Sequence, residues 1–216
     1  MKILNAYSGI GGNRKNWDGE NHDIVAVEYN EEIAKVYRDF YPTDKVIVTD
    51  AHQYILENFQ DFDFIWSSPP CPTHSSIRKA ASKNGQYDAK YPSMNLYEEI
   101  IFLKHYFDGD WVVENVNPYY RDDIRYKKSD LLIEPQESGR HLFWSNFSIP
   151  NLNLDSKQIH KGNCSTWQNK LGIDISSYTF ESVQKRKVLR NCVDPKLGEA
   201  ILKSMNNKQT TLRGLK

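Results

Sequence analysis

The chain has 216 residues, of which 39% are hydrophobic and 12% are aromatic. This length is sufficient for one well-filled core, and this composition excludes an intrinsically disordered chain. The 28 basic and 28 acidic residues balance, but residues 1–69 hold 6 and 12 of them, and residues 70–216 hold 22 and 16. The basic second half favours a surface that faces phosphates, although an ordinary solvated surface explains the same charges.

The same sequence indicates a compartment. No apolar run approaches the length of a membrane-spanning helix, and residues 1–6 lack the pattern of a signal peptide. Cys71, Cys164 and Cys192 are odd in number and form no C-x-x-C pair, which favours free thiols in a reducing compartment. We therefore expect a cytoplasmic protein without a membrane partner.

Strand-like apolar runs alternate with helical stretches in the first half of the chain. The strands are expected at residues 3–7, 24–29, 46–48, 62–66 and 111–114. Helices are expected from a cap at Asn30 to Pro42, over residues 51–59 and over residues 96–107. This alternation predicts an α/β fold with a doubly wound, mostly parallel sheet.

The second half is less regular. A further strand is expected at residues 142–147 and a final helix at 195–205, whereas the polar tail is expected to fray. The polar, glycine-containing stretch in between indicates a loop or a small lobe. These patterns divide the chain into a main domain at 1–150, a small irregular appendage at 151–182, a returning segment at 183–205 and a tail at 206–216.

Three consecutive strands of the predicted sheet end in residues suited to a nucleoside. The first runs into Tyr7-Ser8-Gly9-Ile10-Gly11-Gly12, a turn whose glycines allow a ligand close to the backbone. Glu28 follows the second strand, where it is suited to ribose hydroxyls, and Asp50 follows the third, where it is suited to an adenine amino group. Each residue alone is explained by a tight turn, a surface charge or a helix cap, but their shared position favours a binding site.

The fourth strand ends in Pro69-Pro70-Cys71-Pro72. Because proline stiffens the chain, the Cys71 thiol is held at the carboxyl end of a buried strand, where open α/β sheets place their chemistry. By itself this cysteine is also explained as a small buried hydrophobic residue. The nearby His74 leaves a Cys-His hydrolase as an alternative, whereas no metal is expected because no second pair of ligands lies near.

The order of these motifs, together with Glu114-Asn115-Val116, resembles the DNA cytosine-5 methyltransferase family. The resemblance covers residues 1–150 and 183–203, and it includes the segment Leu189-Arg190-Asn191-Cys192-Val193-Asp194-Pro195. The chain departs from the family pattern at Asn5, Tyr7, Pro72, Arg190 and Asp194. The resemblance implies the fold of an S-adenosyl-L-methionine-dependent methyltransferase, with residues 1–150 as the cofactor-binding and catalytic domain. It also implies that the enzyme methylates C5 of a cytosine flipped out of duplex DNA.

The resemblance assigns roles to individual residues. The Cys71 thiolate would add to C6 of cytosine while Glu114 holds or protonates N3, and Arg140 would bind the cytosine carbonyl, with His141 as the alternative. The residues implied for S-adenosyl-L-methionine are Tyr7, Ser8, Gly9, Gly11, Gly12, Glu28, Tyr29, Asp50, Ala51, Pro70, Asn191 and Cys192.

Contacts to DNA are expected from the segment that follows Cys71 and from residues later in the chain. The polar segment between Cys71 and Leu96 is expected to form a mobile loop that closes over the flipped base and contacts phosphates. The candidate residues for nucleic-acid contact, including some beyond this loop, are Ser75, Arg78, Lys79, Lys83, Asn115, His141, Trp167 and Gln168.

The region available for target recognition is short. Family members carry a large recognition region before the last motif, whereas this chain offers only residues 151–182, with Lys161, Asn163 and Lys170 as further candidates. This length predicts short or relaxed sequence specificity, or a partner protein that supplies recognition. Two alternatives stay open, which are the same chemistry on RNA and a non-catalytic relative that binds nucleic acid. The biological role, in restriction-modification, protection of a viral genome or gene control, also stays open.

Overall fold

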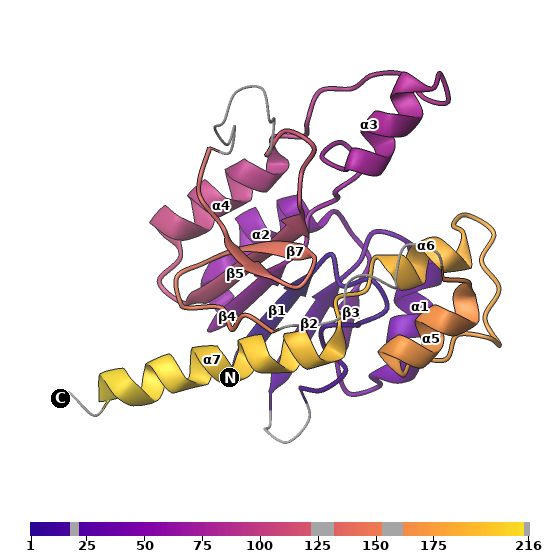
Figure 1. Cartoon of the computed structure of the whole chain (residues 1–216). Coiled ribbons are helices and arrows are strands. Elements are labelled where there is room, and N and C mark those ends of the chain that lie inside the picture. Colours follow the sequence, from indigo (N-terminus) through magenta and orange to yellow (C-terminus); the bar gives the residue numbers. More distant parts are fainter. Residues whose placement is uncertain (18–21, 122–131, 153–161, 214–216) are drawn as a thin grey trace.

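The computed structural model describes residues 1–17, 22–121, 132–152 and 162–213 (Figure 1). Its centre is a seven-stranded sheet with the strand order β3-β2-β1-β4-β5-β7-β6. The strands are β1 (Lys2–Ala6), β2 (Asp23–Val27), β3 (Lys45–Ile47), β4 (Phe64–Ser67), β5 (Asp110–Val116), β6 (Gln136–Ser138) and β7 (His141–Ser145). The first five strands run parallel, and β7 pairs antiparallel with β5 and β6. The predicted doubly wound, mostly parallel sheet is confirmed.

Helices cover both faces of this sheet. The helices are α1 (Glu31–Phe40), α2 (Ala51–Asn58), α3 (Ser76–Lys83), α4 (Asn95–Tyr106), α5 (Cys164–Leu171), α6 (Lys185–Arg190) and α7 (Pro195–Arg213), with a 3-10 turn, η1, at Phe59–Asp61. Neighbouring strand residues point to opposite faces, so Ile65 of β4 packs in the core under α2 and α4, whereas Phe64 and Trp66 pack under α7. Among the described residues, no helix is long and apolar enough to cross a membrane.

The N-caps of helices could be predicted from the sequence because a cap depends on residues that are close together in the chain. The Asn30 side chain accepts a hydrogen bond from the Ile33 amide at the start of α1, as predicted. Asp50 does the same for the Gln53 amide at the start of α2. The Asp50 cap fixes where β3 ends and α2 begins, and therefore holds this carboxylate at the carboxyl edge of the sheet.

One prediction about an irregular segment was wrong, and the last helix is longer than expected. Residues 76–83 form the helix α3, which Ser75 caps through the Ile77 amide, where a mobile loop was expected. None of the eight residues of α3 is buried, and only Ile77, Ala80 and Ala81 are apolar, so no long apolar run marks this helix in the sequence. The tail predicted to fray from residue 206 continues as helix α7 to Arg213.

A small lobe formed by α5 and α6 lies beside α1 (Figure 1). Its core contains Trp167, Leu171, Val188 and Leu189, and this cluster also includes Val36 of α1. The lobe is also tied to α1 by polar contacts, because Glu32 accepts hydrogen bonds from the Glu181 and Ser182 amides. This packing fixes the last sequence motif, which follows α6, against the sheet.

Candidate active site

The candidate site lies at the carboxyl ends of the parallel strands. The strand order reverses between β1 and β4, because β2 and β3 lie on one side of β1, and β4 and β5 lie on the other. Open α/β sheets bind their ligands at such a switch point. The acids and the glycine turn after β1 to β3 therefore share one edge with Cys71 and Glu114 after β4 and within β5.

The turn after β1 has the backbone conformation that its glycines predict. Gly9 and Gly11 have φ values of 55° and 78°, and Tyr7 shares this left-handed region at 56°. A side chain at Gly11 would collide with the Tyr41 ring, and one at Gly12 with Cys192, so these two glycines serve internal packing. A Cβ at Gly9 would meet no atom within 4 Å. Gly9 therefore marks the side of the turn that a ligand can approach.

Two observations near this turn fit a polar ligand. The Ser8 hydroxyl oxygen is buried and has no hydrogen-bond partner among the described residues. A buried polar group without a partner is costly, and a ligand that pairs with it removes that cost. Glu28 accepts hydrogen bonds from the Gly9 amide at 3.0 Å and from the Asn30 amide at 2.9 Å, and burial raises its pKa. The residues present therefore fit a nucleoside cofactor between the glycine turn and Glu28.

The remaining cofactor candidates lie around the same edge. Asp50 uses one carboxylate oxygen to cap α2, and the other has no hydrogen bond in the described part of the chain. Ala51 is buried beneath it, whereas the Tyr29 side chain is 77% exposed. Pro70 follows Pro69 in the loop that leads from β4 to Cys71.

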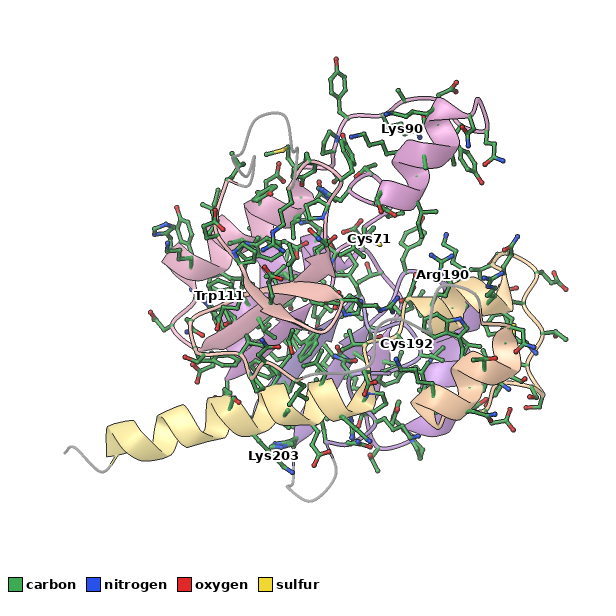
Figure 2. The ribbon with its side chains drawn as sticks, in the orientation of Figure 1. Cys71, Lys90, Trp111, Arg190, Cys192 and Lys203 are labelled. Atoms are coloured by element: carbon green, nitrogen blue, oxygen red, sulfur yellow. The ribbon has the colours of Figure 1, made fainter. Side chains whose placement is uncertain are left out.

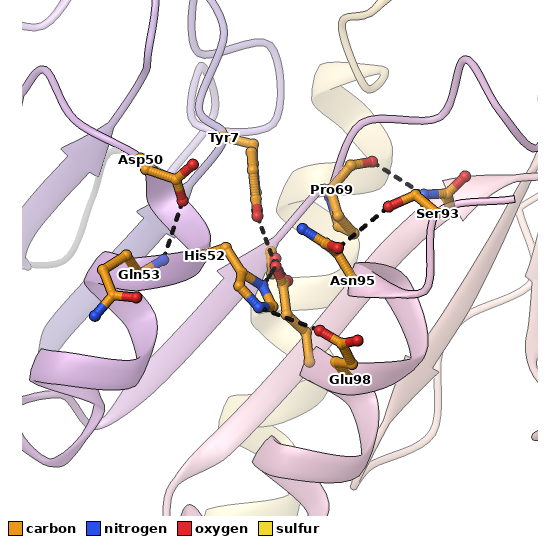
Figure 3. Close-up of polar contacts among 11 residues, drawn as sticks. Tyr7, Asp50, His52, Gln53, Pro69, Ser93, Asn95 and Glu98 are labelled. Carbon is orange, nitrogen blue, oxygen red and sulfur yellow. Dashed lines mark hydrogen bonds and ion pairs between the residues drawn. The ribbon is translucent and has the colours of Figure 1, made fainter. Parts of the chain in front are cut away.

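A buried carboxylate that sequence analysis missed links the two sides of this edge. Glu99 of α4 is 2% exposed, and it accepts hydrogen bonds from the Tyr7 hydroxyl at 2.6 Å and from the Ser67 hydroxyl at 2.5 Å. His52 contacts the same carboxylate through Nδ1 at 2.9 Å, and Figure 3 shows the Tyr7 hydroxyl pointing toward His52. The hydrogen bond with Glu99 raises the pKa of His52, and burial raises the pKa of Tyr7. A glutamate on a helix otherwise resembles a solvated residue, so no local signal identified it.

Cys71 lies where the prediction placed it, four residues beyond the end of β4 and partly buried. Burial raises the pKa of its thiol, and the negative charge of Glu114 raises it further. The positive charges of Arg140 and Arg190 act in the opposite direction and lower this pKa. The Cys71 carbonyl accepts hydrogen bonds from the His74 and Ser75 amides, which fixes the turn after the thiol.

Glu114 is the second residue of this pair. It is 7% exposed, and burial raises its pKa to about 7, although a hydrogen bond from Ser68 and the charge of Arg140 act in the opposite direction. His141 Nδ1 lies 3.5 Å from its carboxylate, but burial lowers the pKa of His141 to about 3, so this imidazole is neutral near pH 7. Glu114 can therefore exist as a protonated acid near neutral pH, which a hydrogen bond to a ring nitrogen requires.

Arg140 joins this pair to the small lobe. Its guanidinium donates a hydrogen bond to the Arg190 carbonyl at 2.7 Å and lies over the Trp167 ring at 5.3 Å. Its charge still acts on both Cys71 and Glu114. The structure thus brings Arg140 near the pair and directs its hydrogen bonds to the C-terminal motif.

The C-terminal motif itself has a packing role in this structure. The Cys192 thiol donates to the Val188 carbonyl at 3.5 Å, and burial raises its pKa to about 12. Its Cβ lies so close to Gly12 that the glycine turn and this motif fit only without a side chain there. Asn191 is exposed at the end of α6.

The predicted nucleic-acid contacts fall into two groups. Arg78 and Lys79 extend from α3 over the rings of Tyr87 and Tyr119, at 4.9 Å and 4.6 Å, and Lys83 is exposed at the end of α3. Ser75 caps α3 through the Ile77 amide, and the other four candidates contact other residues of the protein. Trp167 is buried beneath Arg140, His141 lies against Glu114, the Gln168 side chain bonds the Ile175 amide, and the Asn115 amide donates to the Pro69 carbonyl. Asn115 therefore holds the loop that carries Cys71. Lys161 lies outside the described residues.

The strand order and the residues at its switch point define an α/β protein with a thiol and a buried acid on one side of this point, and a glycine turn with two further acids on the other. Residues 1–144 match the model of the C-5 cytosine-specific DNA methylase family, and the chain belongs to that family.

Individual relatives are more distant. A tRNA (cytosine(38)-C(5))-methyltransferase of Spodoptera frugiperda is 28% identical over 184 residues, which are 81% of this chain and 53% of the relative. A solved structure of a Spodoptera frugiperda DNMT2 mutant is 25% identical, with a TM-score of 0.41 over 58% of this chain and 38% of that one. S. pombe Dnmt2 methyltransferase is 21% identical, with a TM-score of 0.38 over 54% and 34% of the two chains. The chain thus spans about half the length of the curated relative that it matches.

Proposed function

We propose that this protein methylates C5 of cytosine in DNA through a transient bond between Cys71 and C6 of the base. The observation that carries the proposal is the joint placement of Cys71, in the loop after β4, and Glu114, in the adjacent parallel strand β5, with the Glu114 charge acting on the Cys71 thiol. A thiol and a carboxyl group at one edge of a sheet can act on two positions of the same ring.

The two residues have complementary tasks in this reaction. The Cys71 thiolate adds to C6, and Glu114 supplies a proton or hydrogen bond to N3, so negative charge does not accumulate on the ring. C5 then becomes nucleophilic and accepts the methyl group. Loss of the C5 proton and cleavage of the bond between sulfur and C6 restore the aromatic base and the thiol.

The protonation states of the pair are coupled. The charged form of Glu114 raises the pKa of Cys71, so protonation of Glu114 favours the thiolate. A pKa of about 7 keeps a large share of Glu114 protonated near neutral pH. The state in which Glu114 can donate to N3 is therefore also the state in which Cys71 ionises more easily.

S-adenosyl-L-methionine would supply an electrophilic methyl group at this edge. Its adenosine would be held by Glu28 at the ribose hydroxyls and by the free oxygen of Asp50 at the adenine amino group. Ser8 and Gly9 present a buried hydroxyl and an open backbone on the same side of the site. These residues would bind and orient the donor, and Glu99 holds Tyr7, which follows β1, and Ser67, which ends β4.

DNA is the substrate that the family description favours, and tRNA is the second candidate because the curated relative acts on it. We assign the catalytic and cofactor-binding domain to residues 1–150 and a reduced target-recognition segment to residues 151–182. Within that segment, α5 presents polar side chains beside Trp167. A partner protein would supply recognition if this segment is insufficient.

Transfer of labelled methyl groups tests this function. Wild-type protein and the variant Cys71→Ser are incubated with S-adenosyl-L-methionine labelled in the methyl group, and with either duplex DNA or tRNA. Label should enter DNA only with the wild type, and DNA that contains 5-fluorocytosine should form a covalent adduct at Cys71. Cys164→Ser is the matched control, because Cys164 lies at the start of α5 and should leave both signals unchanged. Label in neither nucleic acid would refute the proposed reaction.

A further inference from the structure

The helix α6 carries an unusual concentration of positive charge. Four of its six residues are basic and none is acidic, in the sequence Lys185-Arg186-Lys187-Val188-Leu189-Arg190. Residues three or four positions apart share one face of a helix, so Arg186, Lys187 and Arg190 lie together. Val188 and Leu189 are buried on the opposite face. We call the three cations on the outer side the α6 basic face.

The cations of this face have no acidic partner. Within the described residues, none of the three side chains makes an ion pair or a hydrogen bond. Lys185 differs, because it bonds the Ser176 carbonyl at 3.0 Å. Two basic residues on other helices do have acidic partners, Arg38 with Glu31 and Lys203 with Glu199. Like charges at these spacings destabilise a helix, so an unpaired basic face is explained by an anion that binds to it.

One end of the basic face reaches the candidate active site. The Arg190 carbonyl accepts the hydrogen bond from Arg140, and the Arg190 charge acts on both Arg140 and the Cys71 thiol. Figure 2 shows Cys71 between Arg190 on one side and α3 on the other. The helix α3, which carries Arg78 and Lys79, therefore lies on the other side of Cys71 from Arg190 in this view. A nucleic-acid strand that delivers a base to Cys71 must pass beside one or both helices.

We propose that the α6 basic face binds the phosphate backbone of the DNA strand that carries the target cytosine, with Arg190 at the phosphate nearest to Cys71. This inference rests on the proposed function for its substrate. Arg186 and Lys187 contact the phosphates that follow along the strand, away from the thiol. Such contacts fix the register of the strand and carry no sequence information, which suits a chain with a short recognition segment.

The salt dependence of binding measures these contacts directly. Affinity for a fluorescein-labelled duplex of mixed sequence is measured by anisotropy over a series of salt concentrations. The plot of log affinity against log salt has a slope of about −0.9 per phosphate neutralised. The triple variant Arg186→Gln/Lys187→Gln/Arg190→Gln should flatten this slope by about two to three units and weaken binding at low salt by about tenfold or more. Arg190→Lys keeps the charge and should keep the slope.

The matched control is Lys203→Gln on α7, which removes one exposed charge far from Cys71 in Figure 2 and should leave the slope unchanged. Binding of S-adenosylhomocysteine, which should be equal in all variants, reports that the fold is intact. Should the triple variant fail to fold, each single glutamine variant should flatten the slope by about one unit. An unchanged slope in folded variants would overturn the inference.

The methyl-transfer assay separates this inference from the proposed function. Wild-type transfer to DNA with unchanged slopes in the variants would refute the basic face alone. Variants that lose affinity for DNA while the wild type transfers no label would refute the reaction and retain the face. A slope that changes with a tRNA transcript and not with duplex DNA would overturn the assignment to DNA. A wild type that binds no nucleic acid would refute both proposals.

Discussion

The two sides of the sheet's switch point present similar residues in different surroundings. On the side of β2 and β3, Glu28 and Asp50 are held by backbone amides, and Asp50 is exposed to solvent. On the side of β4 and β5, Cys71 and Glu114 lie close enough to influence each other, and Glu114 is buried. The first arrangement suits binding of a ligand, whereas the second suits proton transfer.

Burial explains this difference more than residue type does. Glu28 and Glu114 are both glutamates near the ends of parallel strands, and burial raises the pKa of both, that of Glu114 to about 7. The antiparallel strand β7 pairs with β5 in the sheet, and the first residue of β7, His141, lies against Glu114. The hairpin of β6 and β7 therefore buries Glu114 on the side of the switch point proposed for catalysis, whereas the side of β2 and β3 is proposed to bind the cofactor. The predictions below test whether the two sides are separable.

The largest effect is expected for Glu114→Gln. This change removes the titrating proton and should slow methyl transfer by about 10²–10⁴-fold, as for other proton-transfer groups. Affinity for S-adenosylhomocysteine, measured by calorimetry, should stay the same because the change lies on the reactive side. Glu137→Gln on β6 is the matched control, since that carboxylate is exposed. Equal activity in Glu114→Gln would remove Glu114 from the mechanism, and lost cofactor affinity would show that the two sides are not separable.

The same variant should be more stable than the wild type at alkaline pH. The folded protein holds the Glu114 proton up to about pH 7, whereas the unfolded chain releases it near pH 4.5. The wild type therefore loses stability as pH rises from 4.5 to about 7, by about 3 kcal/mol. Glu114→Gln has no proton to lose there, so the difference in the free energy of unfolding between variant and wild type should grow over this interval. Urea unfolding at pH 5 and pH 8 measures this difference, and parallel changes in the two proteins would contradict it.

Sequence reasoning located the strand ends well because their signals are local. Apolar runs defined β1, β2, β4 and β5 to within one or two residues, and Asn30 and Asp50 cap the helices that follow β2 and β3. The strand β6 was missed because Gln136-Glu137-Ser138 is polar, and it forms only by pairing with β7 at the edge of the sheet. The helix α3 was missed because it buries no residue.

Cys71 and Glu114 of the candidate site were predicted for the same reason, whereas Glu99 was missed. Cys71 and Glu114 each belong to a short motif of consecutive residues, so both could be identified from the sequence. Glu99 was not, because its partners Tyr7, His52 and Ser67 come from three other elements. A role that depends on tertiary neighbours leaves no pattern in the helix that carries the residue.

The variant Tyr7→Phe tests whether Glu99 links the two sides of the switch point. The variant keeps the ring and removes the hydroxyl, so a buried carboxylate loses one of its donors. Such a loss costs about 1–3 kcal/mol in the free energy of unfolding. We also expect weaker binding of S-adenosylhomocysteine, because the turn that carries Gly9 is less constrained. Tyr91→Phe, at a side chain that is 95% exposed, is the control. Unchanged stability in Tyr7→Phe would exclude Glu99 as the link.

The smallest effect is expected on the binding side, at Asp50. Alanine there removes the cap of α2 and should cost about 1 kcal/mol of stability, whereas asparagine preserves the cap. Asparagine can keep the oxygen that accepts from the Gln53 amide, but it replaces the free oxygen with an amino group, which cannot accept a hydrogen bond from an adenine amino group. Both variants should therefore bind S-adenosylhomocysteine about three- to tenfold more weakly, while only alanine lowers the stability. Calorimetry and urea unfolding separate the two losses. Full affinity in Asp50→Asn would reduce Asp50 to a helix cap, because the free oxygen would then have no ligand to bind.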